Sequence, residues 1–338
     1  MKINNISVII LNWNNKNLLQ KFIPIVLKNS FLPNVEIVVA DNGSTDDSIE
    51  WLKTNYPQIR IIEFPMNYGF SEGYNKAIAT IKSEFSVLLN SDVAPAENWL
   101  QPLVDIMKKN SKVAAVVPKI KDYNNPTKFE YAGAAGGFID RFGYTFCRGR
   151  IFDLIEDDNG QYDDECIIFW GSGAALMVRT ELFKTTGGLD KDFFAHMEEI
   201  DWCWRLKNMG YEIMFTHKSE VFHVGGATLP YNNVKKSFLN FRNNLFLLVK
   251  NKHGFNGLII IVLRIFLDYI AILKHFFSGE FSFSKSIILA HLDFVKKLSL
   301  FMKKRKLLKK TLIKKKHAET YKGSIVFDFF IRKKFKRR

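Results

Sequence analysis

The amino-acid sequence predicts an α/β protein: a Rossmann-like sheet, mixed but mostly parallel and flanked by helices, followed by a C-terminal extension of amphipathic helices. Three observations support this fold class. Up to about residue 118, short runs of β-branched residues alternate with longer stretches of helical periodicity. The short runs are continuously apolar, which is typical of parallel strands buried on both faces. After about residue 230, long patterns rich in Phe, Leu and Ile are interleaved with basic residues.

The predicted elements follow one another in strand–helix order. Strands are expected at residues 7–11, 36–40, 60–64, 85–89 and 113–117, and helices at residues 18–29, 48–55, 72–81 and 99–109. Residues 119–170 are less regular and are expected to form hairpins and loops over a ligand cleft. Later helices are expected at residues 196–209, 234–250, 258–277 and 287–308. A domain boundary near residue 230 divides the chain into residues 1–230 and 231–338.

Polar side chains follow three of the predicted strands at the point where each strand ends. Asn12 ends the first strand, Asp41 follows the second, and Asn90 and Asp92 follow the fourth. Because ligands of open α/β sheets bind beyond the carboxyl ends of the strands, we expect these side chains to line one cleft. Gly69 enters the third helix and would let a ligand approach the backbone closely. Each position also has a structural alternative, as a turn or a helix cap.

A second polar cluster lies on the helix predicted near residue 200. Glu198, Asp201 and Arg205 share one face of it, and Asp201 with Arg205 has the spacing of an ion pair. Glu199 points elsewhere and has no opposite charge at helical spacing, so it is the freest candidate for a general base. The alternative for Glu199 is a solvated glutamate that the helix dipole favours.

Asp92 and His223 are candidates for a metal site. A divalent cation that bridges two phosphates needs few protein oxygens, so Asp92 alone could hold it, or could instead cap the next helix. His223 ends a short apolar run before a glycine pair. It is either a hydrogen-bonded structural residue or, if the fold brings it to Asp92, a second ligand.

In this order and spacing, the segments resemble glycosyltransferase family 2, the nucleotide-sugar transferases with the glycosyltransferase A fold. The resemblance covers roughly residues 5–230, which would be the catalytic domain. The matching segments are residues 7–14, 41–46, 67–70, 90–92, 173–175, 187–190 and 198–201, together with His223.

The resemblance implies roles for individual residues. Asp41 would contact the nucleotide base, and residues 90–92 stand where the DxD motif of the family lies, with Asn90 in place of its first Asp. Asp92 and His223 would bind Mg²⁺ or Mn²⁺. The predicted substrate-binding residues are Asn12, Asp41, Gly69, Asn90, Glu198 and Asp201.

The resemblance also implies an inverting reaction. Glu199, which replaces the usual Asp of the family, would take the proton of an acceptor hydroxyl as that oxygen attacks a nucleotide-diphosphate sugar, and Glu198 is the alternative base. The acceptor would be a glycan or a polyprenyl-linked sugar. Residues 90–92 and 173–175 are similar to those of rhamnosyltransferase-like members that build bacterial surface polysaccharides.

The positive charge is concentrated at the C-terminal end. The chain has a formal charge of +15, and residues 296–338 hold 18 Lys and Arg against Glu319 and Asp328. The apolar stretch at residues 258–273 is interrupted by Arg264 and Asp268, so a membrane-spanning helix is not expected. Basic amphipathic helices favour an anionic membrane surface, which predicts a cytoplasmic protein, peripheral on the inner face of the cell membrane. Three cysteines without CxxC spacing indicate a reduced setting without disulfides.

Two other functions fit part of the sequence. A nucleotidyltransferase that makes a sugar nucleotide would share the α/β cleft and the metal but would release pyrophosphate. A nucleic-acid-binding protein would use the basic C-terminal region, but no RNP, zinc-finger or helix-turn-helix signature accompanies it. We therefore expect no nucleic-acid partner.

Overall fold

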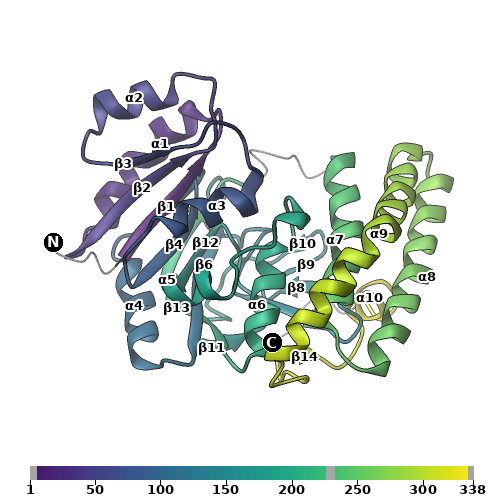
Figure 1. Cartoon of the computed structure of the whole chain (residues 1–338). Helices are drawn as coiled ribbons and strands as arrows, with labels where there is room; N and C mark the ends of the chain where they lie inside the picture. Colours follow the sequence, from purple (N-terminus) through teal and green to yellow (C-terminus); the bar gives the residue numbers. More distant parts are fainter. Residues whose placement is uncertain (1–5, 226–232, 334–338) are drawn as a thin grey trace.

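The computed structural model describes residues 6–225 and 233–333, without the side chains of residues 255 and 256. The strands of the main sheet are β1 (Ile6–Asn12), β2 (Val35–Asp41), β3 (Arg60–Glu63), β4 (Phe85–Asn90), β5 (Val93–Pro95), β6 (Val113–Asp122), β11 (Glu165–Ile168), β12 (Ala175–Arg179) and β13 (Glu212–His223). Within these ranges they form a nine-stranded sheet in the order β11-β13-β6-β12-β4-β1-β2-β3, with β5 paired to β13 (Figure 1). The predicted mixed α/β fold is confirmed.

Strands β4, β1, β2 and β3 run parallel and therefore end at the same edge of the sheet. Asn12 is in register with Asp41, and Leu11 with Asn90, so the polar strand ends lie side by side. Strand β12 runs antiparallel between β4 and β6. The fourth and fifth predicted strands are thus not neighbours, an order that the local pattern of apolar residues does not encode.

Helices cover both faces of this sheet. They are α1 (Lys16–Asn29), α2 (Ser48–Asn55), α3 (Gly69–Ala79), α4 (Leu100–Lys109), α5 (Thr180–Thr185) and α6 (Glu198–Asn208). Ile9 of β1 belongs to one buried cluster together with Tyr74 of α3, whereas Val8 and Ile10 belong to another with Leu19 of α1. Successive side chains of a strand point to opposite faces, so β1 is buried on both, as its continuously apolar sequence predicts.

A smaller sheet lies beside the main one. It consists of β7 (Gly137–Asp140), β8 (Thr145–Cys147), β9 (Arg150–Ile151), β10 (Leu154–Ile155) and β14 (Thr320–Tyr321), in the order β10-β9-β8-β7-β14. Four of these strands fall in the region predicted as hairpins. The fifth, β14, comes from the C-terminal region and pairs parallel with β7.

Three long helices, α7 (Val234–Asn251), α8 (Phe255–Phe277) and α9 (Phe281–Leu308), form the C-terminal region (Figure 1). Phe246 of α7 stacks on Phe301 of α9, with ring centroids 3.8 Å apart. Helix α7 also contacts α6, because Lys250 Nζ donates to Asp201 Oδ2 at 2.7 Å. The predicted boundary near residue 230 lies outside the described residues. In the part of the chain that the structure describes, no helix is long and apolar enough to cross a membrane.

Candidate active site

A cleft of about 540 Å³ opens at the edge where the parallel strands end, and residues at the N-terminal ends of α6 and α7 also line it. Its volume is in the range of small-molecule sites. The predicted site residues that line it are Asn12, Gly69, Asn90, Asp92, Glu198, Glu199 and His223. Residues separated by more than 200 positions in the sequence therefore meet in one place. Asp41 and Asp201 do not line the cleft.

Asp41 lies behind the cleft wall and fixes the loop that follows β2. It is 3% exposed; its Oδ1 accepts from Asn12 Nδ2 at 3.0 Å, and its Oδ2 accepts from the backbone N–H of Ser44 at 2.9 Å. The neighbouring Asn42 faces the cleft instead. Asn12 Oδ1 is buried and has no hydrogen-bond partner among the described residues. The predicted contact between Asp41 and a nucleotide base stays a prediction. Asn12 and Asn42 are among the polar groups that line this end of the cleft.

Asp92 and His223 meet because β5 pairs antiparallel with β13, which places Val93 opposite His223. His223 Nε2 lies 3.1 Å from Asp92 Oδ1 and 3.5 Å from Asn90 Nδ2, and its Nδ1 lies 3.4 Å from Glu130 Oε2. Burial lowers the pKa of His223, but its hydrogen bonds to Asp92 and Glu130 outweigh burial and raise that pKa to about 10. In this arrangement a proton on the imidazole stands between two carboxylates.

This pair of side chains fits a divalent cation. Asp92 offers carboxylate oxygen and His223 offers imidazole nitrogen at the same point of the cleft, and a metal can replace the shared proton there. Among residues 6–225 and 233–333, no group of three or more His, Cys, Asp or Glu side chains is arranged to hold a metal without other ligands. A cation bound at Asp92 and His223 would therefore complete its shell with water and substrate phosphates, as Mg²⁺ does in many phosphate sites.

Glu198 and Glu199 are the first two residues of α6 and both line the cleft. The Oε2 atom of each is buried without a hydrogen-bond partner in the described structure. Burial raises the pKa of Glu199 to about 7. Burial, and then the adjacent charge of Glu199, raise the pKa of Glu198 well above its usual value. A carboxylate that titrates near neutral pH has the property that a general base requires.

Asp201 occupies a different place from the one that the resemblance implied. It is fully buried; its Oδ2 accepts from Arg205 Nε at 2.9 Å and from Lys250 Nζ at 2.7 Å, and its Oδ1 accepts from Asn251 Nδ2 at 2.8 Å. The ion pair with Arg205 is the one that helical spacing predicts. Through these bonds Asp201 joins α6 to α7, and it does not line the cleft. Its predicted part in substrate binding stays a prediction.

The segment that leads into α6 depends on a residue that sequence analysis missed. Phe194, His196 and Met197 all adopt positive φ, at 69°, 67° and 75°, which costs about 1–2 kcal/mol per residue for side chains other than glycine. Asn243 of α7 is fully buried, and its Nδ2 donates to the carbonyl oxygens of Phe193, Ala195 and His196 at 3.0, 2.8 and 2.7 Å. The sequence signal was an Arg-Asn-Asn triplet between the apolar residues of the helix.

Three cations in the cleft were also missed: Arg150 of β9 and Lys235 and Lys236 of α7. Each lies far in the sequence from the motifs, and only the packing of the smaller sheet and α7 brings it there.

The described residues combine a mixed sheet, a polar cleft at its carboxyl edge, an Asp–His pair and a buried glutamate. The sheet and its helices have the arrangement of the glycosyltransferase A fold. Two solved structures share the fold. GalNAc-T7 with UDP, GalNAc and Mn²⁺ aligns with a TM-score of 0.54 and 18% identity, over 65% of this chain and 43% of that chain. The mannosyltransferase PcManGT from Pyrobaculum calidifontis, in complex with GDP-Man and Mn²⁺, aligns with a TM-score of 0.53 and 13% identity, over 91% of this chain and 85% of that chain.

Residues 7–171, just under half of the chain, match the model of glycosyl transferase family 2. An N-acetylglucosaminyl-diphospho-decaprenol L-rhamnosyltransferase of Mycobacterium tuberculosis is 26% identical over 207 residues, which cover 56% of this chain and 66% of the relative. The succinoglycan biosynthesis protein ExoA of Rhizobium meliloti is 24% identical over 213 residues, which cover 60% of this chain and 58% of the relative. The chain thus spans about two thirds or less of these relatives.

Proposed function

We propose that this protein transfers a sugar from a nucleotide-diphosphate sugar to a hydroxyl of a glycan or lipid-linked acceptor, with inversion, in the synthesis of a bacterial surface polysaccharide. The observation that carries the proposal is one cleft lined by Asp92, His223 and the buried carboxylate of Glu199. The names of the relatives from Mycobacterium tuberculosis and Rhizobium meliloti support the lipid-linked acceptor and the polysaccharide pathway.

In this reaction the cleft has two ends. The strand ends of β1 and β4, with Asn12 and Asn90, and the loop with Gly69 hold the nucleotide, and the positive φ of Gly69 (77°) lets its backbone approach the ligand. Asp92 and His223 hold Mg²⁺ or Mn²⁺ together with the donor diphosphate. A divalent cation bound there neutralises the charge that develops on the leaving diphosphate.

Glu199 acts on the acceptor. Its carboxylate accepts the proton of the attacking hydroxyl, and its buried, unpartnered Oε2 has no competing donor among the described residues. The neighbouring Glu198 holds its own proton more tightly, because burial and the charge of Glu199 raise its pKa. We therefore assign the base to Glu199 and place Glu198 as a hydrogen-bond donor to a bound sugar.

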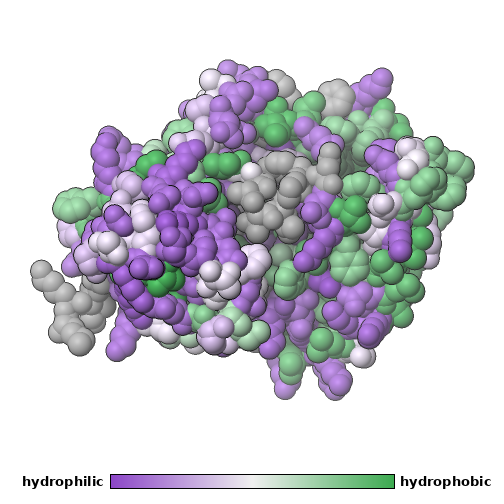
Figure 2. Space-filling view, turned by 90° about the horizontal axis from the view of Figure 1, so that it is seen from above, coloured by the Kyte–Doolittle hydropathy of each residue, from purple (hydrophilic) through white to green (hydrophobic). Residues whose placement is uncertain are grey.

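The exposed surface of α8 and α9 supports a location at a membrane. Exposed apolar side chains gather on these helices, at the right-hand side of Figure 2, and include Leu258, Val262, Phe266, Phe277, Leu292 and Val295. An apolar face bordered by lysines is suited to the interface of an anionic membrane. This supports a protein on the inner face of the cell membrane.

The test is a panel of UDP-, GDP- and dTDP-sugars, each with and without Mn²⁺ or Mg²⁺, read as thermal stabilisation of the full chain. We expect one nucleotide to stabilise the protein only when the cation is present, and we expect Asp92→Asn to remove that dependence. His217→Asn, at a half-buried histidine on the same strand β13 as His223, should keep it. Turnover should release a nucleoside diphosphate. Release of pyrophosphate would identify a nucleotidyltransferase and contradict the proposal.

A further inference from the structure

One wall of the cleft carries positive charge that the donor chemistry does not use. It is formed by Arg150 of β9 with Lys235 and Lys236 of α7, and we call these three residues the cationic wall. The donor diphosphate already has a place at Asp92 and His223. The cationic wall is therefore available to bind a second anionic group, distinct from the donor diphosphate.

Arg150 is the central member of the cationic wall. It is 9% exposed, forms no ion pair with any described carboxylate, and has a buried Nε without a hydrogen-bond partner; its Nη2 lies 3.7 Å from the sulfur of Cys147. Removing a cation from water without a counter-charge is costly, so such residues ordinarily have an anionic partner. The charge of Glu130 acts on Arg150 but forms no ion pair with it, so an anionic ligand in the cleft could pair with this guanidinium.

Lys236 lies beside the same aromatic ring as Arg150. The guanidinium of Arg150 lies 4.5 Å from the ring centroid of Tyr131, and the ammonium of Lys236 lies 5.5 Å from that centroid. Burial and the charge of Arg150 lower the pKa of Lys236, although the charge of Glu130 opposes this. Glu130 is itself engaged, by His223 and by the backbone N–H of Ala132 at 2.5 Å. An anion between Arg150 and Lys236 would relieve their mutual repulsion.

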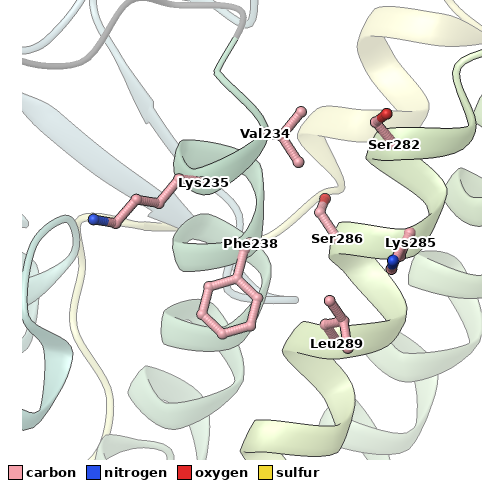
Figure 3. Close-up of a pocket in the computed structure, with 7 residues that line it drawn as sticks. All are labelled: Val234, Lys235, Phe238, Ser282, Lys285, Ser286 and Leu289. Carbon is pink, nitrogen blue, oxygen red and sulfur yellow. The ribbon is translucent and has the colours of Figure 1, made fainter.

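An apolar groove of about 450 Å³ begins beside the cationic wall. It runs between α7 and α9 and is lined by Val234, Phe238 and Leu289, with Lys285 and two serines of α9 (Figure 3). Lys235 lines both the groove and the cleft. Figure 3 shows its side chain extending from α7 away from α9, and its ammonium lies 5.3 Å from the ring centroid of Phe194 in the cleft. The groove and the cleft thus adjoin at Lys235.

We propose that the cationic wall binds the phosphate group of a prenyl-linked acceptor, whose hydrocarbon chain lies in the groove between α7 and α9. The inference rests on the proposed function. Two features identify the ligand: the positive charge of the cationic wall matches its phosphate, and the apolar lining of the groove matches its hydrocarbon chain. Leu289 and Leu292, which continue the apolar surface from the groove along α9, are 45% and 61% exposed, and this favours a lipid over a soluble glycan.

The experiment measures binding of farnesyl diphosphate to the full chain by calorimetry, in EDTA, so that binding at the cation-dependent donor site does not contribute. We expect Arg150→Gln and Lys236→Gln each to weaken binding by about 10-fold or more, since each removes a charge-assisted contact. Lys28→Gln is the matched control, because Lys28 is an exposed lysine on α1, and its affinity should equal that of the wild type.

Inorganic pyrophosphate and farnesol separate the two halves of the ligand. We expect both to bind more weakly than farnesyl diphosphate, and Leu289→Ser to weaken farnesyl diphosphate but not pyrophosphate. Leu300→Ser, at an exposed position further along the same helix and outside the groove, is the control. Equal binding of pyrophosphate and farnesyl diphosphate would leave only an anion site and overturn the assignment of a prenyl ligand.

Binding of the sugar nucleotide, measured in parallel, distinguishes a failure of the acceptor subsite from a failure of the proposed function. Arg150→Gln should retain the cation-dependent stabilisation by the donor and an unchanged circular dichroism spectrum. If the wild type binds donor but not farnesyl diphosphate, or if Arg150→Gln impairs donor binding alone, the acceptor subsite is wrong and the glycosyltransferase stands. If the wild type binds no sugar nucleotide, the proposed function itself fails.

Discussion

Glu199 shows how burial alone prepares a side chain for chemistry. Its carboxylate lies in a cleft, has no partner on Oε2 among the described residues, and has a pKa raised by burial to about 7. The same burial acts on Glu198, whose pKa the charge of Glu199 raises further. Two adjacent carboxyl groups thus acquire different proton affinities, which suits one as a base and the other as a donor.

Exchange of one oxygen for an amide nitrogen tests this division. Glu199→Gln cannot accept the proton, so transfer should fall by about 10²–10⁴-fold while cation-dependent donor binding stays close to that of the wild type. Glu198→Gln, which still donates a hydrogen bond, should retain more activity than Glu199→Gln. Rates measured at saturating donor, with donor binding measured in parallel, check both expectations. The reverse order of the two variants would make Glu198 the base.

The raised pKa also sets a pH dependence. The base must be unprotonated, so kcat/KM should be low at pH values below the pKa of about 7, rise through it, and level off above it. A pH–rate profile between about pH 5 and pH 9, corrected for donor binding at each pH, measures this. A profile that is flat across this range would remove Glu199 from the proton transfer.

At the scale of elements, α7 holds the strained entry to α6. Asn243 donates to three carbonyl oxygens of residues 193–196, and Arg242 Nη2 donates to the carbonyl oxygen of Phe193 at 3.0 Å. Phe194, which lies between these bonds, has positive φ. A helix outside the matched family segment therefore positions the two glutamates of the site.

Asn243→Leu keeps the size of the side chain and removes its donors. Leaving buried carbonyl groups without a partner should lower the free energy of unfolding by about 1–3 kcal/mol and should lower kcat more than it changes the KM for the donor. Asn244→Leu is the matched control, since Asn244 is buried one position further along and donates to the carbonyl of Gly143 at 3.2 Å. Equal loss of stability with equal loss of kcat in both variants would reduce Asn243 to a packing role.

The elements themselves were predictable because their signals are local. The expected helix at residues 48–55 coincides with α2, and β1, β2 and β4 each extend their predicted strands by one residue or two. The antiparallel insertion of β12 was not predictable, because strand order depends on contacts between distant segments. The same limit applies to the partners of Asp201. Helical spacing predicted its ion pair with Arg205, but not the one with Lys250, which lies 49 residues further along the chain on another helix. This limit also explains Arg150, whose significance depends on the absence of an ion pair within the described fold.

At the scale of the whole molecule, charge and apolar surface lie together. The basic residues after position 295 extend along α9, while Phe266 and Phe277 of α8 are 61% and 81% exposed. Phe276, Phe277 and Phe281 meet at the turn between α8 and α9. The surface thus offers a membrane both an electrostatic and a hydrophobic contact.

Vesicle binding measures both contacts. The full chain should sediment with vesicles containing anionic lipid, and added salt should weaken this binding because screening acts on the lysines. Phe266→Ser combined with Phe277→Ser should weaken binding at every salt concentration, since each phenylalanine buries apolar area in the interface. Phe31→Ser, at an exposed site far from α8, is the control. Equal binding to neutral and anionic vesicles would contradict the electrostatic part.

A segment late in the chain also supports the small sheet that carries Arg150. Strand β14 pairs with β7, and the N–H of Ile325 donates to buried Asp140 Oδ2 at 2.9 Å, while the side chain of Ile325 packs against Phe146 and Ile151 beside Arg150. The small sheet therefore depends on a segment 185 residues further along the chain than Asp140. Deleting β14 would uncover the edge of β7, so we expect this deletion to disturb the proposed acceptor subsite at Arg150 before the proposed donor end of the cleft.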